Sequence, residues 1–329
     1  MDFGQEVTIR KVKDEDIPAM VRLFTSQYRH HVMENPILPH RYLDLAVNEE
    51  MIRWLFENYD GVVALVDEEV VGYMGGIIVP HFKGTGTGIY TPEWGHCVDS
   101  RYIPHLYDFL LYHLDQYWRD IPYYRHGISF LGEQNHVMKH FFMSGYGLSV
   151  VDGLVPTSEA QYTSGKYEIR MANVYDWNAL IALVQDYGDM ARSYPLYLNL
   201  HPEQLVEELE EDLQDPLTTL WVAERNRKIV GILKTTEACK ESCTIVRDRK
   251  TLGIGLLVVH PSLRRMGIGT DLLKHIIRWA NQRGFERVTY AIETANVAGR
   301  NFFFKYFSPV CFTLIRYFDD RVMENRRNS

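Results

Sequence analysis

The 329-residue sequence contains only four cysteines, Cys97, Cys239, Cys243 and Cys311. Four thiols in a chain of this length do not make the disulfide framework of small secreted domains, and they are typical of a reducing cytoplasm. Cys239 and Cys243 lie four residues apart without a second Cys or His pair close by. We therefore interpret them as packing residues and expect no metal site.

Long apolar runs and long basic runs are also missing. No stretch reaches the roughly 18 apolar residues that a membrane-spanning helix needs, and the first residues, MDFGQEVTIRKVKDED, lack the apolar core of a signal peptide. The net charge is -8 without a cationic stripe, which argues against nucleic-acid binding. The sequence thus predicts a cytoplasmic protein that binds neither membranes nor nucleic acids. Its acidity would suit an amine substrate, although solubility explains it equally well.

Internal similarity is present at an offset of about 160 residues. The segments IRKVKDEDIPAMVRLF from Ile9 and IRMANVYDWNALIALV from Ile169 each predict a short strand, a polar turn and an amphipathic helix. The segments VVALVDEEVVGYMGG from Val62 and LWVAERNRKIVGILKT from Leu220 each predict a strand hairpin. A third pair, NHVMKHFFMSGYG and NVAGRNFFFKYFS, follows in the same order.

These matches predict a fold of class α/β with two tandem modules. Each module is expected to have a central, mostly antiparallel mixed sheet flanked by helices. The polar, turn-rich run PTSEAQYTSGK, residues 156–166, predicts the boundary between them. The N-terminal module would then span residues 1–156 and the C-terminal module residues 167–329.

The most informative run is TLGIGLLVVHPSLRRMGIGTDLLKHIIRWANQRG, residues 251–284. It predicts a buried strand to Val259 and a helix from Thr270 to Gln282, joined by a loop with Gly267 and Gly269. A helix N-terminus has unpaired backbone N–H groups and a positive dipole end, and glycines let those groups approach an anion. The junction therefore suits a diphosphate, although a purely structural turn can share the pattern.

V-x-P followed by R-x-x-G-x-G and a helix resembles the acyl-CoA signature of the GNAT N-acetyltransferase superfamily. In that family the loop and helix start bind the pyrophosphate, and the preceding strand pairs with the pantetheine arm. The resemblance implies acetyl-CoA as the acyl donor and GNAT-like modules as the fold. It places Leu257, Val258 and Val259 beside the pantetheine. It places the following residues at the pyrophosphate: Arg264, Arg265, Met266, Gly267, Ile268, Gly269 and Thr270.

The family's second signature is an Asn, a small residue three positions later and a Tyr seven positions later. Asn296, Gly299 and Phe303 hold these positions, so the resemblance implies that Asn296 and Phe303 contact the cofactor. Phe303 is a departure, because the usual Tyr is the general acid for the departing thiolate. Tyr306, three residues further on the same helix face, could replace it. Otherwise the thiolate leaves unassisted, which a thiol pKa near 8.5 allows.

An amine acceptor needs a general base, because an alkyl ammonium has a pKa near 10.4. The strand 252–259 carries no carboxylate. Glu293 on the next strand is our candidate, since Ala291 occupies the position of the base in some relatives and strand alternation puts Glu293 on the same face. Alternatively Glu293 is an exposed strand-end carboxylate. A backbone N–H near Val259 is expected to stabilise the oxyanion.

The corresponding junction of the first module, residues 89–118, has a helix but no glycine in its loop. Asp99 and the bulky side chains after it would obstruct a diphosphate, so we expect this module to bind acyl-CoA poorly or not at all. The layout resembles tandem family members with one degenerate half, such as mycothiol synthase.

The sequence therefore predicts an N-acetyltransferase that acylates a primary amine of a small molecule or peptide in the C-terminal module. The alternative is a non-catalytic acyl-CoA sensor, which Phe303 and the missing strand carboxylate favour. The resemblance implies that residues 188–215 contact the substrate. Four glutamates in this segment, Glu207, Glu208, Glu210 and Glu211, either attract a cationic substrate or form a solvated helix face.

Overall fold

The computed structural model describes residues 6–84, 86–159 and 165–327. The chain forms two compact units: unit 1 comprises Met1–Val150 and Val310–Ser329, and unit 2 comprises Val151–Pro309. Residues 160–164 of the predicted linker lie outside the described residues. Among the described residues, no helix has the length and apolar character needed to cross a bilayer.

The division into units differs from the predicted boundary at residues 156–166. The chain passes between the units inside two long strands, β8 (Gly147–Pro156) and β14 (Ser308–Tyr317). In the structure, β8 enters the sheet of unit 2, and β14 enters a sheet of unit 1. The sequence did not predict this, because a polar, turn-rich run shows where regular structure ends but not which sheet the flanking strands join.

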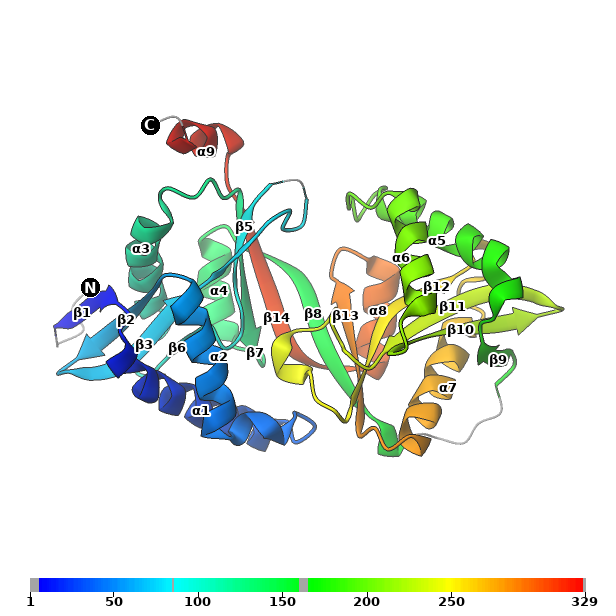
Figure 1. The fold of residues 1–329 in the computed structure, drawn as a ribbon, viewed down its shortest axis with the longest axis horizontal. Coiled ribbons are helices and arrows are strands. Elements are labelled where there is room, and N and C mark those ends of the chain that lie inside the picture. Colours follow the sequence, from blue (N-terminus) through cyan, green and yellow to red (C-terminus); the bar gives the residue numbers. More distant parts are fainter. Residues whose placement is uncertain (1–5, 85, 160–164, 328–329) are drawn as a thin grey trace. The chain divides into compact units, whose positions relative to one another are not determined.

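The strands of unit 1 pair in two series, in the orders β1-β2-β3-β6 and β4-β5-β7-β14. Its strands are β1 (Val7–Lys11), β2 (Gly61–Val66), β3 (Glu69–Gly75), β4 (Ile77–Val79), β5 (Gly88–Thr91), β6 (His96–Val98) and β7 (Arg125–Leu131). Its helices are α1 (Ile17–Glu34), α2 (Leu45–Asn58), α3 (Leu106–Trp118), α4 (Asn135–Met143) and α9 (Asp320–Arg327). Helices α1 and α2 cover one face of the first sheet and α3 covers the other (Figure 1).

Unit 2 contains one sheet with strand order β8-β13-β12-β11-β10-β9. Its further strands are β9 (Glu168–Met171), β10 (Thr218–Arg225), β11 (Lys228–Thr236), β12 (Thr251–Val259) and β13 (Arg287–Glu293). Its helices are α5 (Trp177–Ala191), α6 (Pro202–Gln214), α7 (Ile268–Gln282) and α8 (Val297–Tyr306). The predicted α/β class with helix-flanked sheets is confirmed.

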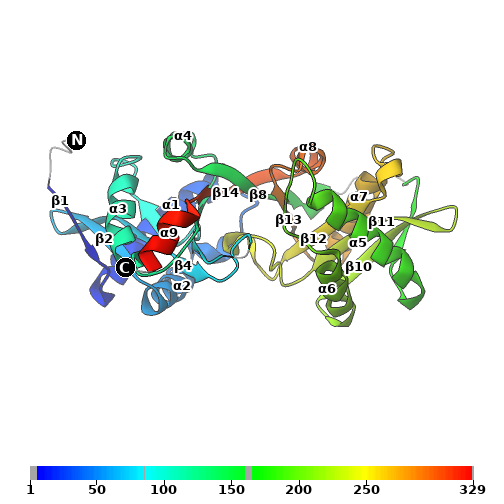
Figure 2. The same ribbon diagram turned by 90° about the horizontal axis from the view of Figure 1, so that it is seen from above.

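The two faces of the unit 2 sheet follow from strand alternation. Val222 of β10 packs in a core cluster with α5 and α6, whereas the neighbouring Trp221 contacts His275 and Trp279 of α7. Successive strand residues point to opposite faces, so α7 lies on the face opposite α5 and α6 (Figures 1 and 2). The strand pairs from β9 to β12 are antiparallel, and β12 and β13 are parallel.

One contact occurs in both units at the predicted offset. Both guanidinium nitrogens of Arg10 donate to Asp16, at 2.7 and 2.8 Å, and those of Arg170 donate to Asp176, at 2.7 and 2.9 Å. In each unit the same aspartate also accepts from the backbone N–H three residues before it, at 2.8 Å. This bidentate pair fixes the first strand to the start of the first helix in both units.

A cleft between two diverging strands

Strands β12 and β13 of unit 2 pair over only part of their length. The parallel pairing runs from Thr251 opposite Arg287 to Ile254 opposite Tyr290 and ends there. On its other side β12 continues to pair with β11 as far as Val259, with a bulge at Gly255. Because a bulge bends its strand, β12 diverges from β13 and leaves one of its edges open.

The divergence opens a cleft of about 600 Å³. It is lined by α5 and the segment after it, by β12, by the loop into α7 and by the ends of β13 and α8. The lining residues predicted from sequence are Leu257, Val258, Val259, Arg264, Arg265, Gly267, Ile268, Gly269, Thr270, Glu293 and Asn296. The structure therefore brings together eleven of the fourteen predicted residues, and Met266, Phe303 and Tyr306 do not line the cleft.

The loop into α7 presents free backbone N–H groups to the cleft. Helix α7 begins at Ile268, two residues earlier than predicted, after Gly267 with φ +94°. A side chain at Gly267 would meet no atom within 4 Å, so glycine is needed there for its left-handed backbone. The backbone N–H groups of Ile268, Gly269 and Thr270 have no hydrogen-bond partner among the described residues. They form the positive end of the helix dipole, which favours an anion.

Gly269 lies against an apolar wall of the cleft. A Cβ added there would stand 3.6 Å from the ring of Phe302 and 3.8 Å from the side chains of both Leu257 and Val259. Val258, between these two strand residues, packs on the opposite face with α5 and α6. Leu257 and Val259 thus offer side chains to the α7 side of the cleft.

The two loop arginines border the cleft, whereas Met266 lies outside it. Arg264 donates from Nε to the Val259 carbonyl at 3.3 Å, and both Arg264 and Arg265 line the cleft. Met266 is exposed, and its carbonyl accepts a hydrogen bond from Tyr167 at 3.1 Å. The predicted cofactor contact of Met266 therefore has no support from its side-chain position.

Asn296 and Phe303, which were predicted together, have different surroundings. Asn296 is the N-cap of α8, with its Oδ1 accepting from the Gly299 N–H at 2.9 Å, and it lines the cleft. Phe303 is fully buried and stacks on Phe307 with ring centroids 5.4 Å apart. Since each helix residue is rotated by about 100° from the one before, α8 turns the neighbouring Phe302 toward the cleft instead.

The two predicted catalytic groups lie at different places. Glu293 lines the cleft at the end of β13. The Tyr306 hydroxyl is 2.9 Å from Thr270 Oγ1, which places it at the start of α7. Tyr187 of α5 also lines the cleft and was not predicted, although its spacing from the buried Leu183 and Val184 indicates the inner helix face. Burial, and then the negative charge of Glu293, raise the pKa of Tyr187.

The segment 188–215 contributes apolar side chains, not carboxylates, to the cleft. Met190, Leu196 and Leu198 line it. The four glutamates of α6, at 207, 208, 210 and 211, are all exposed. This exposure favours the solvated-face interpretation of those glutamates.

All four cysteines are buried, and none of them forms a disulfide. Cys243 lies in a buried group with Asp152 and Cys311 whose ligand atoms are within 4.8 Å of one another, which could hold a metal ion. The interpretation of Cys243 as a packing residue therefore stays a prediction.

Known proteins resemble the chain in sequence and in fold. Residues 183–307 match the model of the acetyltransferase (GNAT) family. The chain is 31% identical over 115 residues to "Probable N-acetyltransferase camello" of Xenopus laevis, covering 32% of the chain and 47% of that protein. It is 32% identical over 111 residues to "Acetyl transferase GW6a" of Oryza sativa subsp. japonica, covering 31% of the chain and 26% of that protein. The chain thus spans less than half the length of these curated relatives.

Among solved structures, the GCN5-related N-acetyltransferase from Sphaerobacter thermophilus superposes with a TM-score of 0.57 at 14% identity. That match covers 94% of this chain and 95% of the other, so the likeness of fold extends over both units. The matched family residues include the whole of the loop and helix start that line the cleft. On these findings residues 183–307, which lie in unit 2, belong to the acetyltransferase (GNAT) family.

Proposed function

We propose that unit 2 is an N-acyltransferase that binds acetyl-CoA in this cleft and acetylates a primary amine of a small molecule or peptide. The observation that carries the proposal is the row of free N–H groups at Ile268, Gly269 and Thr270, which faces a cleft opened by diverging strands. We further propose that unit 1 is a degenerate copy of the same module, and that the protein acts in the cytoplasm.

The cleft suits a diphosphate joined to an extended chain. The free amides at the start of α7 would bind the phosphate oxygens, with Arg264 and Arg265 adding positive charge. The open edge of β12 beyond Ile254 leaves backbone groups for an amide-containing arm to pair with. Leu257, Val259 and Phe302 provide apolar contacts along the arm.

In the proposed reaction, the amine nitrogen attacks the thioester carbonyl and the carbon–sulfur bond then breaks. Glu293 takes the proton that the ammonium must lose before attack, directly or through water. The second proton leaves the nitrogen to water as the tetrahedral intermediate breaks down to the amide and the thiolate. A backbone N–H near Val259 stabilises the oxyanion. The Tyr306 hydroxyl is 2.9 Å from Thr270 Oγ1 at the start of α7 and Tyr306 does not line the cleft, which favours unassisted departure of the thiolate.

Glu293→Gln tests the assignment of the base. We expect kcat to fall by about 10² to 10⁴, with acetyl-CoA affinity within about twofold of wild type. Thiol release from acetyl-CoA in the presence of ethylenediamine, glucosamine and a short peptide measures turnover. Glu207→Gln, on the exposed face of α6, is the matched control and should leave kcat unchanged. Full activity of Glu293→Gln would remove Glu293 from the mechanism.

The second candidate function is an acyl-CoA sensor without catalysis. It is favoured by Phe303, which has no hydroxyl and is buried away from the cleft. The same amine panel separates the two functions. Tight acetyl-CoA binding without thiol release from any amine would support the sensor and contradict the transferase.

A further inference from the structure

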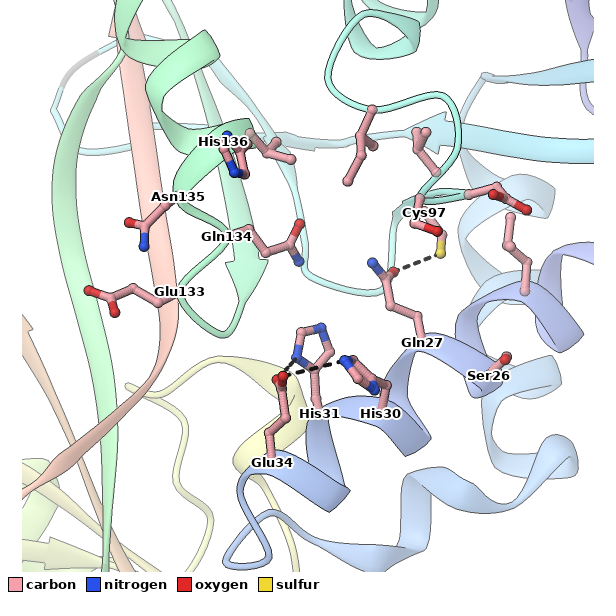
Figure 3. Close-up of a pocket in the computed structure, with 16 residues that line it drawn as sticks. Ser26, Gln27, His30, His31, Glu34, Cys97, Glu133, Gln134, Asn135 and His136 are labelled. Carbon is pink, nitrogen blue, oxygen red and sulfur yellow. Dashed lines mark hydrogen bonds and ion pairs between the residues drawn. The ribbon is translucent and has the colours of Figure 1, made fainter.

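Unit 1 contains a second cleft, of about 680 Å³ (Figure 3). It is formed by α1, by β6 and the loop after it, and by the turn after β7 with the start of α4. The cleft of unit 2 is formed by the corresponding parts: the first helix, a strand with its following loop, and a strand-to-helix corner. The two clefts therefore occupy corresponding places in the two units.

The loop of the unit 1 cleft offers few free amides to a diphosphate. The Arg101 N–H donates to the Asp99 carboxylate and the Tyr102 N–H to the Asp99 carbonyl, both at 2.9 Å. At the start of α3, the Leu106 N–H donates to the Tyr102 carbonyl at 3.1 Å. The carboxylate of Asp99 also borders the cleft. These amides are satisfied within the loop and are not available to an anion, and the Asp99 carboxylate is paired with the Arg101 guanidinium at 2.8 Å.

His31 of α1 is an unsatisfied polar group within the unit 1 cleft. It is 8% exposed, and its Nε2 is buried without a hydrogen-bond partner. Its ring extends from α1 toward the space beneath Gln134 (Figure 3). Burial lowers the pKa of His31, so the ring is neutral near pH 7 and keeps one nitrogen lone pair. The Glu34 carboxylate on the Nδ1 side favours the tautomer with the proton on Nδ1, which makes Nε2 the acceptor. A buried acceptor needs a donor, because its desolvation is otherwise uncompensated.

The groups around His31 are acceptors and carry negative charge. The Glu34 carboxylate stands 3.9 Å from His31 Nδ1 and 3.3 Å from His30 Nε2. Gln134 donates its amide nitrogen to the Leu131 carbonyl at 2.9 Å, which leaves its oxygen as an acceptor. No lysine or arginine is among the residues that line this cleft in the described chain, whereas Glu34, Asp99 and Glu133 are.

We propose that the unit 1 cleft binds a small molecule bearing a primary ammonium group, with His31 Nε2 and the Glu34 carboxylate as acceptors. An ammonium group has three N–H donors and a positive charge, which match a neutral imidazole, an amide oxygen and a carboxylate. A divalent metal fits less well. A metal site needs at least three ligand atoms close together, and in the described residues neither His31 nor Glu34 belongs to a group of three ligand residues whose ligand atoms lie within 4.8 Å of one another. The site does not depend on acyl transfer in unit 2.

Calorimetric titration of the full chain with spermidine, without acetyl-CoA, tests this proposal. We expect spermidine to bind, and tetramethylammonium, which has the charge but no N–H donor, to bind at least tenfold more weakly. Glu34→Gln and His31→Phe should each weaken spermidine binding at least tenfold. Glu57→Gln, an exposed carboxylate of α2 outside the cleft, should not change it.

Glu293→Gln in the cleft of unit 2 separates this proposal from the proposed function. Spermidine binding that is lost in Glu293→Gln and kept in Glu34→Gln would assign the ligand to unit 2 and overturn the proposal. Equal affinity for tetramethylammonium, or binding of Zn²⁺ but not spermidine, would also overturn it. The side chain of Glu34 is 62% exposed, so Glu34→Gln should fold even if His31→Phe does not.

Discussion

At the scale of single residues, the close packing of Phe303 against Gly153 limits the size of the side chain at position 153. The Phe303 ring lies so close to Gly153 of β8 that a Cβ at position 153 would clash with it, and that Cβ would also come within 3.0 Å of Phe307 Cβ. Both rings are buried. Because close-packed interiors absorb little extra volume, glycine is required at this position for close approach.

Gly153→Ala should therefore destabilise the chain. We expect a loss of about 1 to 3 kcal/mol in the free energy of unfolding, the usual cost of overpacking, measured by denaturant titration. Gly147→Ala, on the same strand, is the control, because a Cβ there meets nothing within 4 Å. Equal stability of the two variants would mean that the Phe303 ring can move aside.

The sequence predicted which segments form the site better than it predicted which side chains face the cleft. The loop glycines, Glu293 and Asn296 line the cleft as the family pattern indicates. The pattern fails at Phe303, because a one-residue difference in helix phase decides whether Phe302 or Phe303 faces the cleft. Tyr187 was missed because its role depends on the packing of α5 over the sheet, which no local motif encodes.

At the scale of elements, β6 and β7 each hold a buried neutral histidine. His126 contacts Tyr146 at 2.6 Å and Thr91 at 3.0 Å, and His96 contacts Tyr107 at 2.9 Å and the Ser129 carbonyl at 2.8 Å. Burial lowers the pKa of His126 to about 3 and that of His96 to about 4. An unfolded histidine has a pKa of about 6.5.

These two histidines should make the folded state lose stability as the pH falls. Between about pH 6.5 and pH 4 the unfolded chain binds protons that the folded chain does not, so each histidine contributes a loss of about 1.4 kcal/mol per pH unit. We expect unfolding at pH 5 to take up two or more protons, since burial also lowers the pKa of His31 and His275. Denaturant titrations from pH 5 to pH 7 measure this proton uptake. His126→Gln should lower the number of protons taken up on unfolding by one. A free energy of unfolding that stays constant over this range would contradict the neutral, buried state.

The strands and helices themselves were largely predictable, because their apolar spacing is local information. Strand β12 has the predicted bounds, and α7 ends at the predicted Gln282. The early start of α7 depends on the left-handed backbone of Gly267. The partners of β8 and β14 could not be predicted, because strand pairing is set by contacts distant in sequence.

At the scale of the whole molecule, the two units place clefts of different chemistry on corresponding elements. The offset of 160 residues, visible in the sequence, reappears in the paired contacts Arg10–Asp16 and Arg170–Asp176. The loop of unit 2 presents free amides, while that of unit 1 satisfies several of its amides internally and adds Asp99. We therefore expect one acyl-CoA site per chain.

Calorimetric titration with acetyl-CoA, for wild type and for Gly269→Trp, tests this claim most directly. A Cβ at position 269 makes only ordinary contacts, so the variant should fold, while its indole ring would fill the cleft. Ser100→Trp, in the corresponding loop of unit 1, is the control. We predict one site per chain, lost in Gly269→Trp and kept in Ser100→Trp. Two sites per chain, or undiminished binding by Gly269→Trp, would contradict the account.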